Sequence, residues 1–216
     1  PMVKTAERWR EEAVEGFTFT LKAWQAVTHP TTSPTWRRRK GKLTEEERQN
    51  FGHFQPNREV LAAWEETRKR AEALDAAVCT FQAPASFGCT GEHEDHIRRF
   101  FGSIERGGMA LAWEPRGDWN EHPERIKSLC DELDLIHVVD LMRRTPLSDH
   151  PFAYIRLHGL NEKEFDYRYT YTSEDLDILA GKLQELAATW ERVYCFFNND
   201  GMFENAPDLQ ERLFSL

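Results

Sequence analysis

The sequence predicts an α/β fold of the TIM-barrel class, the (β/α)8 type, and two observations carry this expectation. Strand-like segments alternate with helix-like segments along the chain, which is typical of a parallel sheet covered by helices. Within the strand-like segments, apolar side chains alternate with polar or small ones, as where Ile155 and Leu157 alternate with polar neighbours in 152–159. A doubly wound sheet is apolar on both faces, so this pattern favours a barrel with a polar mouth.

The expected elements follow one another in a regular order. Strand-like segments are short runs of aromatic, β-branched and aliphatic residues, and helix-like segments repeat apolar residues every three to four positions. The expected strands are 17–23, 76–84, 109–117, 135–140, 152–159 and 192–200. The expected helices are 4–13, 57–74, 92–104, 121–133, 173–190 and 203–214.

Local signals support individual elements and mark two irregular connections. Trp64 and Leu74 fall on one face of the helix before the second strand, and Thr172 or Ser173 caps the helix before the last strand. The connection between the fourth and fifth strands is too short for a crossover helix. The connection 24–57 contains three prolines and is unusually long, so we expect a functional loop there.

The number of strands is smaller than a closed barrel needs. Six strands are visible in 216 residues, whereas a (β/α)8 barrel typically takes about 250 residues. The chain also opens at Pro1 directly into a charged helix-like stretch. We therefore expect a single domain, 1–216, that is N-terminally truncated and lacks the first two strands of its barrel.

Charge and cysteine content limit the class of protein. The net charge of −9 argues against a protein that coats nucleic acid by bulk charge, but it leaves room for a local basic groove. The four cysteines are widely spaced without a Cys-x-x-Cys pair, so we expect reduced thiols and a cytoplasmic location. The sequence has no long apolar span, and we expect no membrane partner.

Polar side chains end the strand-like segments, although buried strands usually consist of apolar residues. Because the carboxyl ends of parallel strands meet at one rim, and ligands bind at that rim, we expect these side chains to form a site. They are Lys22, Gln82, Glu114, Arg116, Asp140, Arg156, His158, Asn198 and Asn199.

Glu114, Asp140 and His158 are the candidate catalytic residues. The two carboxylates suit general acid–base chemistry, or all three side chains suit a divalent metal that keeps an open position for water. The rim holds one clear histidine, joined at most by His29 from the loop after the first strand, which is thin for a multi-metal site. We therefore assign no metal ligand and leave the cofactor, a divalent metal included, open.

Lys22, Arg116 and Arg156 are the candidate anion-binding residues. Arginine suits this role because its guanidinium can grip a phosphate or carboxylate with two hydrogen bonds. Alternatively, these three cations neutralise Glu114 and Asp140 inside the barrel, since buried charges need partners. Both interpretations hold together if a ligand completes the network.

Amide and aromatic side chains extend the candidate ligand site. Gln82, Asn198 and Asn199 offer hydrogen bonds to a sugar or a base, or alternatively they cap neighbouring loop backbone. Trp24 is the candidate for stacking on a ligand.

Three other features have a structural and a functional interpretation. The basic run is a solvated loop or, if it lies at the rim, a contact to a phosphate backbone; it comprises Arg37, Arg38, Arg39, Lys40 and Lys42. The GEHEDH run at 91–96 looks metal-binding, but we expect a solvated helix end whose acids favour the helix dipole. His137 lies within a strand, and we expect a hydrogen-bonded core residue there.

Five motifs occur in order along the chain: LKAWQAVTHP, FQAP, WEPRG, YIRLHG and FNN. Together they resemble the YecE-like family, the domain of unknown function numbered seventy-two, and AWQAVTHP, WEPRGDW and ELDLIHVVD are most similar to its archaeal-type branch. The resemblance implies a TIM barrel related to xylose isomerase and endonuclease IV. It also implies two further strands at the start, which this sequence lacks. It implies no activity.

These observations lead to three functional hypotheses. The first is a hydrolase of phosphoester substrates, nuclease-like, with an anion-binding pocket at the carboxyl-end rim. The second is a non-catalytic binding module for a small phosphorylated ligand or nucleic acid. The third, a sugar-phosphate isomerase-like enzyme, depends on fold analogy alone. The sequence leaves the substrate and the oligomeric state open.

Overall fold

The computed structural model describes residues 1–38 and 43–214, and the chain divides into two compact units. The first unit is Pro1–Leu135 and the second is Ile136–Leu216. Each unit is an α/β structure with a three-stranded parallel sheet. In the described part of the chain, no helix is long and apolar enough to cross a membrane.

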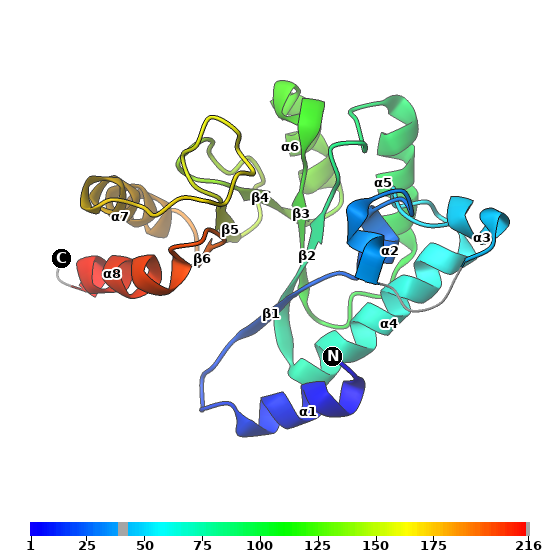
Figure 1. The fold of residues 1–216 in the computed structure, drawn as a ribbon, viewed down its shortest axis with the longest axis horizontal. Helices are drawn as coiled ribbons and strands as arrows, with labels where there is room; N and C mark the ends of the chain where they lie inside the picture. The colour runs from blue at the N-terminus through cyan, green and yellow to red at the C-terminus, as the bar shows by residue number, and fades with distance from the viewer. Residues whose placement is uncertain (39–42, 215–216) are drawn as a thin grey trace. The chain divides into compact units, whose positions relative to one another are not determined.

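The first unit places β1, β2 and β3 side by side in chain order. Lys22 pairs in register with Thr80, and Gln82 pairs with Glu114, so these strands end at the same edge. Helix α4 packs against β1, β2 and α1 (Figure 1). The elements are α1 (Val3–Glu12), β1 (Phe19–Lys22), α2 (Gln25–Thr28), the 3-10 helix η1 (Pro34–Arg38), α3 (Glu45–Gln49), α4 (Arg58–Leu74), β2 (Ala76–Gln82), α5 (Gly91–Ser103), β3 (Ala110–Glu114), the 3-10 helix η2 (Gly117–Glu121) and α6 (Pro123–Glu132).

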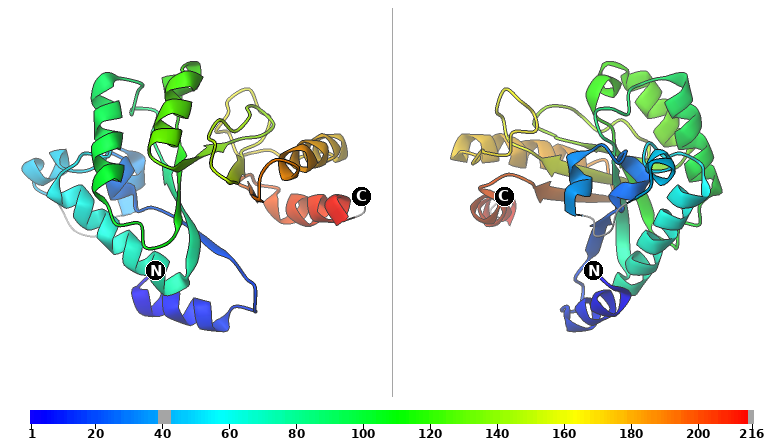
Figure 2. Two further views of the ribbon diagram at one scale, coloured as in Figure 1. Left: turned by 180° about the vertical axis from the view of Figure 1, so that it is seen from behind. Right: turned by 45° about the vertical axis from the view of Figure 1, so that its right-hand side comes forward.

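The second unit has the parallel strand order β4, β5, β6. Val139 pairs in register with Ile155, and Leu157 pairs with Phe197. Helices α7 and α8 lie side by side and both contact β6 (Figures 1 and 2). The elements are β4 (Leu135–Val139), β5 (Phe152–Leu157), α7 (Ser173–Ala187), β6 (Arg192–Phe197) and α8 (Met202–Phe214). The first residue of β4, Leu135, is counted with the first unit.

Side-chain caps explain where the main helices begin. The Asn57 side chain accepts a hydrogen bond of 2.9 Å from the backbone N–H of Val60 and starts α4. Thr172, one of the two caps that the sequence offers, is the N-cap of α7 and forms a reciprocal capping box with Asp175. Such caps each contribute about 0.5–2 kcal/mol because they satisfy amide groups that have no partner inside the helix.

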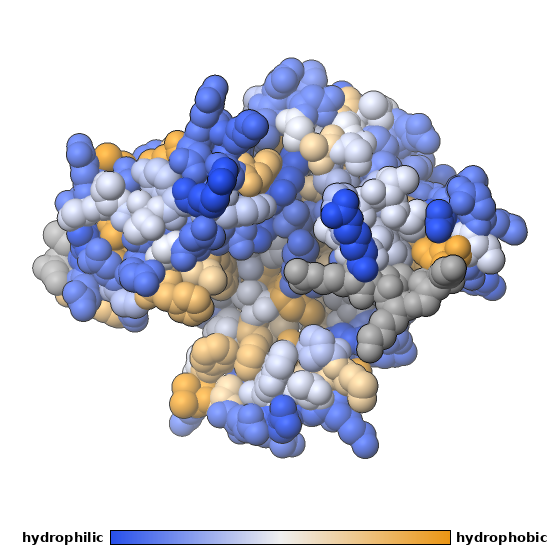
Figure 3. Space-filling view, in the orientation of Figure 1, coloured by the Kyte–Doolittle hydropathy of each residue, from blue (hydrophilic) through white to orange (hydrophobic). Residues whose placement is uncertain are grey.

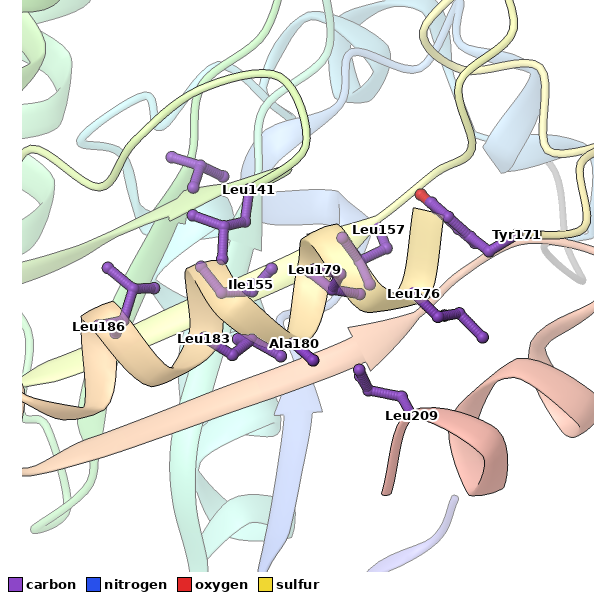
Figure 4. Packing of buried hydrophobic residues seen from close by; sticks show 12 residues of the cluster. Leu141, Ile155, Leu157, Tyr171, Leu176, Leu179, Ala180, Leu183, Leu186 and Leu209 are labelled. Atoms are coloured by element: carbon purple, nitrogen blue, oxygen red, sulfur yellow. The ribbon is translucent and has the colours of Figure 1, made fainter. Parts of the chain in front are cut away.

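Each unit has its own apolar core. In the second unit, leucines of α7 pack on Ile155 and Leu157 of β5, and Tyr171 and Leu209 close the ends of this cluster (Figure 4). The core of the first unit is aromatic. Phe81 of β2 contacts Trp64, Phe54, Phe100 and Phe101 with ring centroids 4.9–6.1 Å apart. Burial of such rings is the main stabilising contribution to the first unit.

The structure confirms the six strands and the parallel α/β fold that the sequence predicts. Two local expectations are wrong. The segment 24–57 is not one long loop, because it contains α2, η1 and α3, and the helix expected at 121–133 starts only at Pro123, after η2. The closed eight-stranded barrel, the two missing strands and the single domain stay predictions.

The apolar face of β1 also differs from expectation. In the run 17–23, Phe17, Phe19 and Leu21 alternate with polar residues, and this pattern predicts an apolar face that packs under helices. Instead, Phe17 is 51% exposed, and Phe19 and Leu21 are only half-buried. Hydrophobic residues accordingly gather on the surface over β1 and the loop that leads to it from α1 (Figure 3).

Candidate functional site

The three strands of the first unit end in polar side chains at one edge. Lys22 is the last residue of β1, Gln82 of β2 and Glu114 of β3. The Lys22 ammonium donates a hydrogen bond of 3.0 Å to Oε1 of Gln82. The expectation that these side chains share a rim is therefore met within the first unit, which we call the first rim (Lys22, Gln82, Glu114 and Arg116).

Glu114 and Arg116 form a buried ion pair on the first rim. Their exposed fractions are 4% and 9%. Nε and Nη2 of Arg116 lie 3.0 and 2.6 Å from the same oxygen, Oε1 of Glu114. A buried carboxylate requires such a partner, because desolvation without compensation costs several kcal/mol. For this pair the alternative interpretation of the sequence, neutralisation of charge, is confirmed.

His29 lies buried beside this rim, and its pKa depends on the charges of the rim residues. Its Nδ1 lies 2.7 Å from Oγ1 of Thr28, and its carbonyl accepts a hydrogen bond from the indole of Trp36. The pKa of His29 is lowered to about 4, chiefly by burial; the positive charges of Lys22 and Arg116 contribute to this lowering, and each contributes more than the opposing charge of Glu114. The rim is therefore an electropositive environment at the position of His29.

A short segment clamps α2 and His29 in place. The backbone N–H groups of Gly52, His53 and Phe54 donate to carbonyls of residues 26–28 in α2. Gly52 has φ +86°, and a Cβ atom there would lie 2.3 Å from the carbonyl carbon of His29. Sequence reasoning missed this clamp. The only signal was a glycine next to a histidine within a segment that looked like a loop.

The GEHEDH run has a structural role that corrects the expected solvated helix end. Nδ1 of His93 lies 2.7 Å from the carbonyl oxygen of Gly88, and Nδ1 of His96 lies 3.0 Å from that of His53. Glu94 forms ion pairs with Arg98 and Arg125. These side chains are half-buried and join α5 to loops of the first unit.

Asp140 and His158 form the polar centre of the second unit. Both side chains are buried, and they follow the adjacent parallel strands β4 and β5. Oδ2 of Asp140 accepts a 2.9 Å hydrogen bond from the backbone N–H of His158, and it lies 3.6 Å from Nδ1 of the imidazole. Oδ1 accepts from the backbone N–H of Met142 at 3.1 Å. Backbone amides therefore hold the Asp140 carboxylate close to the imidazole of His158, at a separation longer than a hydrogen bond.

Asn199 holds a loop in place, as the alternative interpretation of the sequence stated. Its Nδ2 donates to the carbonyl of Tyr169 at 2.7 Å and to Oδ1 of Asn205 at 3.1 Å. Its Oδ1 is buried and has no hydrogen-bond partner among the described residues. Asn198 and Arg156 are half-buried on the same unit, and their ligand-binding roles stay predictions.

Metal binding receives no support from the side-chain geometry. Among residues 1–38 and 43–214, no group of three or more His, Cys, Asp or Glu side chains could hold a metal ion. Glu114 belongs to the first unit, and Asp140 and His158 belong to the second. Metal binding by Glu114, Asp140 and His158 stays a prediction.

The other candidates fall in different environments. His137 is buried, as expected of a core residue, and its backbone N–H donates to Oγ of Ser148 at 3.0 Å, whereas its ring Nδ1 has no partner among the described residues. Trp24 is 42% exposed, and its backbone N–H is anchored to Oγ1 of Thr67. Arg37 is exposed, whereas Arg39, Lys40 and Lys42 of the basic run lie outside the described residues.

Comparisons with known proteins agree with this architecture. The family model described as "Protein of unknown function DUF72" matches residues 1–216. The UPF0759 protein YunF of Bacillus subtilis is 25% identical over an alignment of 234 residues. The alignment covers 96% of this chain and 76% of YunF.

Solved structures show the same fold. A DUF72 family protein from Thermotoga maritima is 23% identical with a TM-score of 0.71, over 99% of this chain and 80% of that one. One from Enterococcus faecalis is 18% identical with a TM-score of 0.70, over 99% and 85%. A D-tagatose 3-epimerase-like protein is 14% identical with a TM-score of 0.54, over 99% and 81%. Similarity at these identities concerns the fold alone.

Proposed function

Since the chain belongs to the DUF72 family, whose function is unknown, we propose a function from its own residues: it binds phosphorylated ligands at the first rim. The YecE-like designation and the archaeal-type branch stay predictions from the sequence motifs. The ligand's phosphate contacts Lys22 and Arg116, and Gln82 contributes an amide next to them.

The observation that carries this proposal is the placement of Lys22, at the end of β1, and Arg116, just after β3, on one rim beside the buried His29. Two cations and one carboxylate, Glu114, act on the same buried imidazole, and their net effect lowers its pKa. Burial, the largest cause of this lowering, disfavours charge of either sign, but the further contributions of Lys22 and Arg116 reflect a positive potential, and such a potential favours an anion. Arginine and lysine donors also match the geometry of phosphate oxygens.

Removing the rim cations tests this function. We expect Lys22→Met to weaken the binding of inorganic phosphate by about tenfold, which corresponds to about 1.4 kcal/mol, because one charge-assisted contact is lost. Isothermal titration calorimetry at constant ionic strength measures this effect. Lys127→Met on α6 removes an exposed lysine outside the rim and serves as the matched control.

Arg116→Met is expected to weaken phosphate binding too. It should also lower the stability of the fold, because it leaves the buried Glu114 carboxylate without its guanidinium partner. A thermal unfolding scan of each variant separates loss of binding from loss of folding. Equal phosphate affinity in the wild type, Lys22→Met and the folded fraction of Arg116→Met contradicts the proposal.

A second candidate function is phosphoester hydrolysis, favoured by the Asp140–His158 pair. A buried carboxylate next to an imidazole is an arrangement that enzymes use to orient a general base or acid. In this hypothesis His158 transfers protons, Asp140 orients it, and Arg156 holds phosphate. Glu114 is a weaker candidate than the sequence indicated, because Arg116 contacts its carboxylate with two nitrogens.

Activity assays distinguish hydrolysis from binding alone. The substrates are DNA, RNA and phosphomonoesters, each with and without divalent metal ions. If the chain is a hydrolase, we expect His158→Asn to lower kcat at least 100-fold, as is typical for loss of a general acid or base. Glu114→Gln tests the carboxylate of the first unit, and unchanged turnover in this variant excludes Glu114 from catalysis. Unchanged turnover in His158→Asn contradicts the role of the pair.

A sugar-phosphate isomerase-like activity stays a hypothesis of fold analogy. The D-tagatose 3-epimerase-like neighbour supports the fold at 14% identity, and similar folds host unrelated reactions. Among the described residues of the two units, no contact favours this activity over the two functions above.

A further inference from the structure

An apolar groove lies beside β1 in the first unit. It has a volume of about 620 Å³ and is lined mainly by Trp9, Phe19, Leu21, Trp24 and Leu74. Its polar lining includes Lys22, which also belongs to the first rim. A volume between about 300 and 1,000 Å³ is typical of a pocket for a small organic ligand. Lys22 therefore connects a phosphate-binding rim to an adjoining apolar groove.

Two half-exposed indoles distinguish this groove from ordinary surface. Trp9 and Trp24 are each 42% exposed, although most tryptophans of the described chain are buried. The backbone N–H of Trp24 donates to Oγ1 of Thr67 on α4 at 3.2 Å, so the residue is anchored. This bond fixes the backbone that carries the indole, and an uncovered indole offers a planar apolar face on which a ligand ring can stack.

The charged lining favours a heteroaromatic ring over an alkyl chain. Glu66 and Arg70 line the groove as an ion pair, with Nη1 of Arg70 2.9 Å from Oε2 of Glu66. An alkyl chain placed there would remove water from this pair without offering hydrogen bonds, which is unfavourable. A nucleobase offers a planar face to an indole and a hydrogen-bonding edge to such polar groups.

We propose that the ligand of the first rim is a nucleotide, whose phosphate contacts Lys22 and Arg116 and whose base stacks on Trp24 in the adjoining groove. This inference rests on the phosphate-binding function proposed above and names its ligand class. The base contributes about 1–3 kcal/mol by stacking, which corresponds to roughly a 5- to 150-fold gain over the sugar phosphate alone.

Three ligands separate the contributions of phosphate and base: AMP, ribose 5-phosphate and adenosine. Calorimetric titration of the intact chain is expected to show that AMP binds at least about fivefold more tightly than ribose 5-phosphate. It is also expected to show that AMP binds more tightly than adenosine. Trp24→Ala should make AMP bind no more tightly than ribose 5-phosphate, and it should leave the affinity for ribose 5-phosphate unchanged. Trp24→Phe should keep part of the difference in affinity between AMP and ribose 5-phosphate.

Lys22→Met should instead reduce the difference in affinity between AMP and adenosine. Phe203→Ala removes an aromatic residue that is 78% exposed on α8 of the second unit, and it should alter none of the affinities. Thermal unfolding of each variant verifies that the chain remains folded.

The outcomes distinguish this inference from the proposed function. If ribose 5-phosphate binds as tightly as AMP, phosphate binding stands and the nucleotide inference is wrong. If hexyl phosphate binds more tightly than AMP, the groove accepts an alkyl chain and the nucleotide inference is again wrong. If none of the phosphorylated ligands binds, both the phosphate-binding function and the nucleotide inference are wrong. A self-associated state in which AMP does not bind also overturns the inference, since a second copy then covers the groove.

Discussion

Replacing Gly52 with alanine is expected to destabilise the chain by about 3 kcal/mol or more. The backbone at Gly52 has φ +86°, and its missing Cβ would lie 2.3 Å from the carbonyl carbon of His29 and 2.4 Å from the nitrogen of Pro30. Both neighbours are backbone atoms, which cannot move aside as a flexible side chain would. A left-handed conformation of a residue with a Cβ and an overpacked contact each cost about 1–3 kcal/mol.

Urea unfolding of the variant measures this effect, and Gly102→Ala is the matched control. Gly102 lies in α5 with nothing within 4 Å of its added Cβ, so alanine there should be neutral or stabilise the helix by up to about 1 kcal/mol. We also expect Gly52→Ala to weaken phosphate binding in its folded fraction, because Gly52 packs on the backbone of His29 beside the rim. A Gly52→Ala chain as stable as Gly102→Ala would contradict the close approach in the structure.

The sequence predicts the strands well because their signal is local. A run such as ALAWE alternates small or polar residues with large apolar ones, and this period of two identifies the strand and its faces without knowledge of distant contacts. The polar end of each strand is equally local, so Lys22, Gln82 and Glu114 could be placed on one rim once the strands were taken as parallel.

The roles of these side chains are less predictable, because they depend on partners that composition does not reveal. Arg116 could grip a ligand, neutralise a carboxylate or do both, and only the 2.6 Å contact in the structure shows that it neutralises Glu114. His96 looked solvated because its acidic neighbours are. Its contact with the carbonyl of His53, 43 residues away in sequence, could not be inferred from a helical pattern. The clamp at Gly52 was missed for the same reason.

Acidification is expected to destabilise the folded chain because several imidazoles are buried in their neutral form. Burial lowers the pKa of His29 and His53 to about 4 and that of His137 to about 3, from an ordinary value of 6.5. Below pH 6.5 the unfolded chain therefore binds protons that the folded chain does not. The free energy of unfolding falls as the pH falls from 6.5 towards 4, and these groups contribute no pH dependence above pH 6.5.

The size of this effect makes His137 the most informative position. Each unit of pKa depression corresponds to about 1.4 kcal/mol, so a fully buried imidazole contributes a few kcal/mol, whereas solvent screening reduces the contribution of the half-exposed His53. His137 is 2% exposed, and the charge of Arg144 adds to the effect of burial. Below pH 6.5, its loss should reduce the slope of unfolding free energy against pH by up to about 1.4 kcal/mol per pH unit.

Urea unfolding between pH 4 and pH 7 of the wild type, His137→Gln and His122→Gln isolates this contribution. Carboxylates titrate in the same range, but they are shared by all three chains, so the difference between slopes belongs to the histidine. His122 has a 42% exposed side chain and serves as the exposed histidine with which His137 is compared. Glutamine at position 137 is itself buried, which lowers stability at every pH without altering the slope. A His137→Gln chain with the slope of the wild type would therefore show that His137 is protonated at the same pH in the folded and unfolded chains, contrary to its burial.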